Sequence, residues 1–428
     1  MLFISFAAYN NIMRKIIFLT IIPLFALFTS CNDTNTGEPT EDPPKNDIKP
    51  STFTHLPIVR IIIDGGKNVS SNKSVYRTMT AEFDPNNMSP GDTIIAKGQI
   101  RGRGNSTWDM PKRPYKIKLD EKAGIFGLNP AKKWILLANY ADKTLMRNYL
   151  AFEMSEKLNM DYTPQHLFVE LFINGVHQGN YLLTDQIEIG NGRLEAVNLL
   201  EIDQRIYETQ NKPWFKTSRF PVVIEEPTDI TQAEKNQISG YFNNAERILD
   251  SNNYKDPKNG FRKYYDTKSV IKWLLINELF KNVDARTYSS IYFHQRLTGE
   301  KLFMGPVWDF DLGAGNSGHS EVCQRATGWH VLYNAYIYRM YTDPDFKQEM
   351  QVAWNTYKPV LLAVIMSIDS VKEYLKYSQE ENFNIWPIFN DNEWYSVTNL
   401  PDNYAGQVEF LKKYLLDRFD WMDSQINP

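Results

Sequence analysis

The sequence contains little cysteine and little histidine: two cysteines and six histidines among 428 residues. It has no H-E-x-x-H, no G-x-x-x-x-G-K-[ST] and no G-x-S-x-G motif. These absences exclude a zincin metalloprotease and a P-loop enzyme, and they disfavour a serine hydrolase. Positive charge is not in excess either, because 47 lysines and arginines are set against 51 aspartates and glutamates, a net charge of −4. Without a global basic field, a nucleic-acid partner is not expected.

The apolar run at the amino terminus, Ile16–Phe28, is too short to span a membrane. Arg14 and Lys15 precede it, and small residues follow it directly before Cys31. This pattern predicts a secretory signal peptide over residues 1–30. The ending resembles a bacterial lipobox, so we predict an exported lipoprotein anchored through Cys31 on the periplasmic or cell-surface side. A signal peptide cleaved nearby without lipidation is the alternative.

Residues 31–53 are polar, proline-rich and acidic, which is typical of a flexible, disordered tether. Lipidation of Cys31 would leave Cys323 alone, and that excludes an internal disulfide in the mature chain. The membrane is therefore expected as a partner only through the lipid anchor.

Residues 54–428 have globular composition, with no internal repeat and no second low-complexity linker. The first half alternates in ways that favour strands, and the second half is mostly helical, which predicts an α+β fold. Expected strands cover residues 58–63, 74–83, 93–101, 114–119, 133–138, 167–174, 179–185, 220–224, 290–295 and 301–308. Expected helices cover residues 142–158, 231–251 and 269–280.

Cationic residues follow a glycine-rich turn in the first half. Arg101 and Arg103 lie in this turn, where arginines and backbone N–H groups can cover phosphates. Lys116 and Lys118 occupy one face of the next strand. Each of these residues also has a simpler interpretation as an exposed surface charge.

A helix carboxylate, Glu153, lies within the apolar stripe of the helix expected over residues 142–158, where it needs a cationic partner. At the start of this helix we expect Asp142 to act as the N-cap and Arg147 to make a surface ion pair.

Three aspartates carry the strongest chemical signal. Asp309 and Asp311 are two residues apart at an expected strand end, so both carboxylates project to one side. Hard oxygen ligands of this kind suit Mg²⁺ or Mn²⁺. Asp284 follows a buried helix, and the hairpin after it returns to Asp309. Phosphoryl transfer needs such a base beside a metal.

The stretches RGRGNSTWDMPKRPYKIKLD, FGLNPAKKWILLANYADKTLMRNYLAFEMSEKL, NELFKNVDARTYSSIYFHQ and GPVWDFDLGAGN resemble the spore-coat protein H (CotH) kinase family. The resemblance implies an atypical protein-kinase-like fold with two lobes: a sheet-rich amino-terminal lobe over about residues 54–226 and a mainly helical carboxy-terminal lobe over about 227–428. It also implies a phosphotransferase of secreted or surface location that uses ATP and Mg²⁺ or Mn²⁺.

By this resemblance, Asp284 is the catalytic base and Asp309 the metal-holding aspartate, assisted by Asp311. Lys116 or Lys118 is the lysine that grips the nucleotide, with Glu153 as its partner on the helix. The asparagine that holds a second metal in ordinary kinases falls near Ser289 or Ser290 here, and we assign it to Ser289. No HRD triplet precedes Asp284, which departs from ordinary kinases.

The expected partners are a nucleotide and an unknown protein or other hydroxyl-bearing acceptor, and the expected state is a monomer. Two other functions stay open. A glycoside hydrolase also uses strand-end acids as acid and nucleophile, although it does not explain the lysine strand and Glu153. A non-catalytic surface adhesin or scaffold with this fold has no need of all three aspartates.

Overall fold

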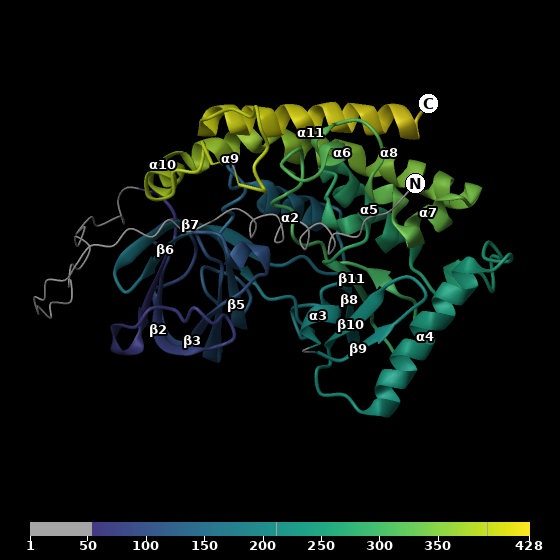
Figure 1. Cartoon of the computed structure of the whole chain (residues 1–428), viewed down its shortest axis with the longest axis horizontal. Coiled ribbons are helices and arrows are strands. Elements are labelled where there is room, and N and C mark those ends of the chain that lie inside the picture. The colour runs from purple at the N-terminus through teal and green to yellow at the C-terminus, as the bar shows by residue number, and fades with distance from the viewer. Residues whose placement is uncertain (1–53, 211, 392) are drawn as a thin grey trace, which may run out of the picture. The chain divides into compact units, whose positions relative to one another are not determined.

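The structure, a computed structural model, describes residues 54–428 apart from residues 211 and 392 (Figure 1). The predicted signal peptide, Cys31 and the predicted tether lie outside the described residues. Within the described part of the chain, no helix combines the length and the apolar character needed to cross a membrane.

Seven strands of the amino-terminal half form a closed barrel in the order β1-β2-β3-β4-β5-β7-β6. The barrel closes because β1 pairs with β2 on one side and runs parallel to β6 on the other. Alternating sequence produces these strands: in β2, Met79, Ala81 and Phe83 are buried and their neighbours are not. The bounds are β1 Ile58–Ile63, β2 Arg77–Asp84, β3 Ile94–Gly102, β4 Tyr115–Ala123, β5 Ala131–Leu137, β6 His166–Ile173 and β7 Val176–Asp185.

Large apolar side chains fill the interior of the barrel. Phe83, Trp134 and Tyr181 all belong to this core and are almost completely buried. A barrel of this size has an interior just wide enough for its own side chains. Residues of the barrel that contact a ligand must therefore come from its rim or its outer face.

Five shorter strands form a second sheet in the order β12-β11-β8-β10-β9. Their bounds are β8 Asn198–Ile202, β9 Trp214–Lys216, β10 Pro221–Glu226, β11 Ile291–Gln295 and β12 Phe303–Met304. The sheet combines strands that precede residue 226 with strands that follow it. The lobe boundary expected between residues 226 and 227 therefore falls inside a single sheet.

Helices make up most of the remaining described chain. Helix α4 begins at a capping box, in which Thr231 and Glu234 bond each other's backbone N–H groups. The bounds are α2 Arg147–Lys157, α3 Ile206–Thr209, α4 Gln232–Asp250, α5 Thr267–Phe280, α6 Glu321–Gln324, α7 Ala335–Tyr341, α8 Pro344–Met366, α9 Ile368–Tyr374, α10 Lys376–Ile385 and α11 Tyr404–Ile426.

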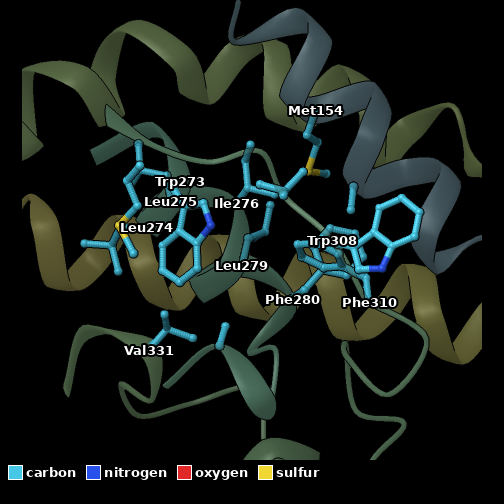
Figure 2. Packing of buried hydrophobic residues seen from close by; sticks show 14 of the residues in the cluster. Met154, Trp273, Leu274, Leu275, Ile276, Leu279, Phe280, Trp308, Phe310 and Val331 are labelled. Carbon is cyan, nitrogen blue, oxygen red and sulfur yellow. The ribbon is translucent and has the colours of Figure 1, made fainter. Parts of the chain in front are cut away.

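Helix α5 is buried on nearly every side and contacts α2, α8 and α11. Figure 2 shows Trp273, Ile276 and Leu279 of this helix inside the apolar cluster. At the end of the helix, Phe280 packs against Phe310 with ring centroids 5.1 Å apart. The core thereby fixes the helix end that leads to Asp284 next to the loop that carries Asp309.

A buried lysine joins the barrel to helix α10. The Lys112 ammonium donates to Ala138 O at 2.8 Å, to Asn382 Oδ1 at 2.8 Å and to Asn180 O. Burial lowers its pKa to about 7, but all three of its hydrogens have acceptors. This contact ties a helix near the carboxy terminus to the barrel.

The predicted α+β class is confirmed by two sheets and a set of helices in one chain. The closed seven-stranded barrel is not the form of an ordinary kinase lobe, so the two-lobed kinase-like architecture stays a prediction. Barrel closure depends on the parallel pairing of β1 with β6, two strands more than a hundred residues apart, and sequence alternation does not reveal such a pairing.

Candidate active site

A cavity of about 470 Å³ lies where the barrel rim, the five-stranded sheet and the loops after α5 and β12 meet. Its apolar lining includes Ile135, Ile187, Leu199 and Val223. Its cationic lining consists of Lys73, Arg101, Arg103, Lys116, Arg205 and Lys212. Its carboxylates are Glu201, Asp203, Glu225, Asp284, Asp309 and Asp311. The cavity therefore combines an apolar part, a cationic part and an acidic part.

Asp284 begins the short 3₁₀ helix η5, Asp284–Arg286, just after α5. His330 bonds Val283 O at 3.2 Å and the Asn334 side-chain amide donates to Arg286 O at 2.8 Å, so both ends of this segment are held. Burial, and to a smaller extent the charge of Asp309, raises the pKa of Asp284 to about 7. A carboxylate with this pKa is suited to accept a proton near neutral pH.

Asp309 lies in a loop and not at the end of a long strand. The strand expected over residues 301–308 is limited to β12, Phe303–Met304, so the strand-end reasoning for Asp309 and Asp311 was wrong. The backbone of Asp309 is left-handed, with φ of 70°. The Asn282 side-chain amide donates to its carbonyl at 3.1 Å, and Ser290 Oγ donates to its Oδ2 at 3.4 Å.

Asp311 is buried at the cavity wall. Burial raises its pKa well above the ordinary value, and the charges of Asp309, Asp142 and Asp284 act in the same direction. Asn316 donates to its carbonyl oxygen at 2.7 Å. Despite the incorrect strand, all three predicted aspartates line one cavity.

Helix α2 holds the loop that carries Asp309 and Asp311. Arg147 is completely buried, donates to Gly313 O at 2.9 Å and to Ala314 O at 3.2 Å, and pairs with Asp142 at 2.5 Å. The expectation that Arg147 makes a surface pair was wrong, because its partner is buried with it. Asp142 is not the N-cap either, since the helix begins five residues later at Arg147, although it does accept the Arg147 N–H at 2.8 Å.

Three of the six cations of the cavity, Arg101, Arg103 and Lys116, come from β3, β4 and the turn between them. Arg101 and Lys116 are direct neighbours across these strands. Burial and the nearby Arg101 lower the pKa of Lys116 to about 8. The guanidinium of Arg103 lies over the Trp308 ring, 5.5 Å from its centroid, and lines the same cavity as Asp309. Among the described residues, the side chains of Lys116 and Arg103 have no hydrogen-bond or ion-pair partner.

Three predicted site residues lie elsewhere. Lys118 shares the outward face of β4 with Lys116, as predicted, but it is exposed and does not line the cavity. Glu153 bonds His166 Nε2 at 3.3 Å, so within the described structure it pairs with a histidine and not with Lys116. Ser289 is completely buried and is not among the residues that line the cavity, whereas the neighbouring Ser290 does line it.

Sequence reasoning missed the carboxylates of the sheet. Glu201 belongs to β8, a strand that was not predicted, and it is only 6 % exposed. Burial and the charge of Glu225 raise its pKa well above the ordinary value. Glu225, near the end of β10, also lines the cavity and pairs with Lys212 at 2.6 Å. A lone glutamate inside the short apolar run of β8 was the one available signal.

Residues 100–422, most of the chain, match the family described as CotH kinase protein. The chain belongs to this family. A search of the curated proteins finds no match. The matched segment contains the glycine-rich turn, Lys116, Asp284 and both aspartates of the Asp309 loop, so the family resemblance seen in the sequence is confirmed.

Membership of the CotH kinase family implies a nucleotide and a divalent cation. In the described part of the chain, no group of three or more His, Cys, Asp or Glu side chains is arranged to hold a metal ion. Mg²⁺ bound with a nucleotide usually takes one or two carboxylates and fills its other positions with phosphate oxygens and water. The carboxylates of Asp309 and Asp311 in a cavity that also contains unpaired cations fit this donor set.

Proposed function

We propose that this protein is a kinase that transfers the γ-phosphoryl group of ATP to a hydroxyl group, probed first as Ser or Thr of a protein, with Mg²⁺ or Mn²⁺. The observation that carries the proposal is that Asp284, Asp309 and Asp311 line the same cavity as Lys116 and Arg103. Kinase catalysis is mostly positioning and charge stabilisation, and it needs these two kinds of group together.

The cavity offers a distinct place for each part of a nucleotide. Apolar side chains from the barrel and the sheet, including Ile135, Leu199 and Val223, suit a planar base. Arg103 and Lys116 supply cations for the phosphates, and the guanidinium can bind two phosphate oxygens at once. A bound divalent cation would neutralise phosphate charge, and the carboxylates of Asp309 and Asp311 are the residues that would hold it.

In this proposal, Asp284 takes the proton of the acceptor hydroxyl. The acceptor oxygen forms a bond to the γ-phosphorus, the bond from that phosphorus to the bridging oxygen breaks, ADP leaves, and the hydroxyl proton passes to the Asp284 carboxylate. The raised pKa of Asp284 supports this role, because a carboxylate of ordinary pKa is a weaker base.

The site of action is proposed from the sequence alone. The amino-terminal pattern of residues 1–31 supports an exported lipoprotein that is anchored through Cys31. A monomer that meets its acceptor at a membrane surface is the simplest arrangement of this kind.

Nucleotide binding to the purified full chain tests the proposal. We expect ATP with Mg²⁺ or Mn²⁺ to raise the melting temperature, and we expect transfer of the labelled γ-phosphate to a generic protein acceptor or to the chain itself. Asp309→Ala should abolish transfer and leave the fold intact. Asp64→Ala, an exposed aspartate outside the cavity, is the matched control.

Two outcomes would contradict the proposal: a melting temperature that does not respond to nucleotide and metal, or label transfer that survives in Asp309→Ala. Cleavage of soluble glycans would support a glycoside hydrolase instead. Nucleotide binding with no transfer under any condition would support the non-catalytic scaffold.

A further inference from the structure

The family resemblance assigns the second metal-holding position to Ser289, whereas the structure places the carboxylate of Glu201 next to this part of the chain. Ser289 lies outside the cavity, and Ser290 lines it with a left-handed backbone, φ of 60°. A neutral hydroxyl is a weaker ligand for a hard cation than a carboxylate. The backbone N–H of Ser290 donates to Glu201 Oε1 at 3.1 Å, which brings a carboxylate to this position.

Glu201 lies in a central strand of the five-stranded sheet and lines the cavity. It lies in β8 between β10 and β11, where its direct neighbours are Val223 and Tyr292. It is 6 % exposed and lines the cavity. A carboxylate buried to this degree is unfavourable unless a cation or several hydrogen bonds compensate its charge.

Two cations of the cavity near Glu201 are engaged with other carboxylates. Arg205 pairs with Asp203 at 2.8 Å, and Lys212 pairs with Glu225. Glu201 has no ion-pair partner among the described residues, and its Oε2 has no hydrogen-bond donor there. One oxygen of this carboxylate therefore has no partner within the described structure and is accessible from the cavity.

The same serine connects Glu201 to Asp309. Ser290 N–H donates to Glu201, and Ser290 Oγ donates to Asp309 Oδ2 at 3.4 Å. Both carboxylates line the same cavity as the guanidinium of Arg103. We propose that Glu201 adds a further carboxylate to the divalent-cation site of Asp309 and Asp311, in the position that a catalytic-loop asparagine takes in ordinary kinases. This inference rests on the proposed function.

Mn²⁺ binding tests the inference without measuring activity. Free Mn²⁺ is titrated by electron paramagnetic resonance against the full chain with a non-hydrolysable ATP analogue. Glu201→Gln keeps an acceptor oxygen for Ser290 and removes the charge, so we expect Mn²⁺ affinity to fall at least about tenfold. Asp64→Asn, an exposed aspartate outside the cavity, should change Mn²⁺ affinity by less than about twofold.

A second variant separates a metal ligand from a positioning role. Ser290→Gly keeps the backbone N–H and tolerates the left-handed backbone, but it removes the hydroxyl that contacts Asp309. If Glu201 binds the cation directly, Mn²⁺ affinity should stay within about threefold. If Glu201 acts only through Ser290 on Asp309, Ser290→Gly should weaken Mn²⁺ binding strongly, and that result overturns the inference.

The outcomes distinguish this inference from the proposed function. Wild-type Mn²⁺ affinity in a folded Glu201→Gln variant overturns the inference and leaves the kinase proposal standing. Failure of the wild-type chain to bind Mn²⁺, with or without the nucleotide analogue, overturns both. Should Glu201→Gln not fold, the Ser290→Gly result still decides between direct and indirect action.

Discussion

The barrel and the five-stranded sheet differ in the kind of side chain that they bury. The barrel is closed, and its interior is filled by apolar side chains such as Trp134 and Tyr181. The sheet is open, and the face that lines the cavity carries Glu201, Glu225 and Tyr292 together with apolar residues. The comparison separates a region that supplies stability from a region that places charge.

The barrel supplies unpaired cations to the cavity, whereas the sheet supplies carboxylates together with cations that already have carboxylate partners. The outer face and rim of the barrel contribute Arg101, Arg103 and Lys116, whereas the sheet and its loops contribute the carboxylates, of which Asp203 and Glu225 pair with Arg205 and Lys212. Several of these carboxylates have raised pKa values, so ionising them within the fold is unfavourable until a cation is bound. The ionised carboxylates therefore lower the stability of the fold, but they provide the charge that binds a cation. Such a conflict between stability and function is common at functional sites.

The largest expected effect on the transfer rate comes from a substitution of Asp284, one of the carboxylates of the cavity. Asp284→Asn removes the proton acceptor, so the rate of transfer should fall about a hundredfold to ten-thousandfold. The melting temperature should not fall, because a buried charge is removed. Steady-state transfer of labelled phosphate and thermal unfolding in the same buffer check both expectations. A variant that transfers at the wild-type rate would exclude Asp284 as the base.

The stability of Asp284→Asn as a function of pH tests whether the cavity buries a charge at this position. The folded-state pKa of Asp284, about 7, lies above the ordinary value of 3.8, so between these values the folded chain binds a proton that the unfolded chain releases. The wild-type chain therefore loses stability from this group as pH rises through that window. In metal-free buffer, Asp284→Asn should be more stable than wild type at pH 8 and equally stable at pH 4. A stability difference that does not change with pH would contradict the burial of this charge.

A substitution inside the barrel should lower stability and leave the transfer rate unchanged, the opposite of the effect expected for Asp284→Asn. Trp134→Ala removes a completely buried side chain from the interior and leaves a cavity, which should lower the free energy of unfolding by about 3–5 kcal/mol. The transfer rate should stay near wild type at temperatures where the variant is folded. Denaturant unfolding and the rate measured at low temperature check this. A large loss of rate without a loss of stability would show that the barrel interior contributes to function.

The features that could be predicted from the sequence are those that depend on a local pattern of residues, such as strand alternation. Most barrel strands follow from alternation, and Asp284, Asp309 and Asp311 do line one cavity, although the strand argued for the last two is mostly loop. Contacts between distant segments were not predictable. The pairing of Glu153 with His166, the burial of Arg147 and the entry of Glu201 into the cavity all depend on how helices and short strands pack. Strand β8 has five residues, all buried, so it carries no alternation to detect.

The smallest expected effect concerns two lysines on the outer face of the barrel. Lys116 and Lys118 are two residues apart on β4, about 7 Å along the strand, and they share one face. Only Lys116 lines the cavity, next to Arg101, whereas Lys118 is exposed opposite Lys133. Charge at an exposed position is screened by water and salt, so it contributes little to binding.

Lys116→Met should therefore weaken ATP binding about tenfold or more, because a charged hydrogen bond in a buried site is worth about 1.5–3 kcal/mol. Lys118→Met should weaken ATP binding by less than about twofold, and its residual effect should vanish at high salt. Methionine keeps the length of the apolar stem, so each change isolates the ammonium group. Calorimetric titration of both variants at low and high ionic strength measures the two affinities. Equal losses for the two variants would show that phosphate is bound along the open face of β4 and not inside the cavity, because only a site reaching across that face contacts both side chains.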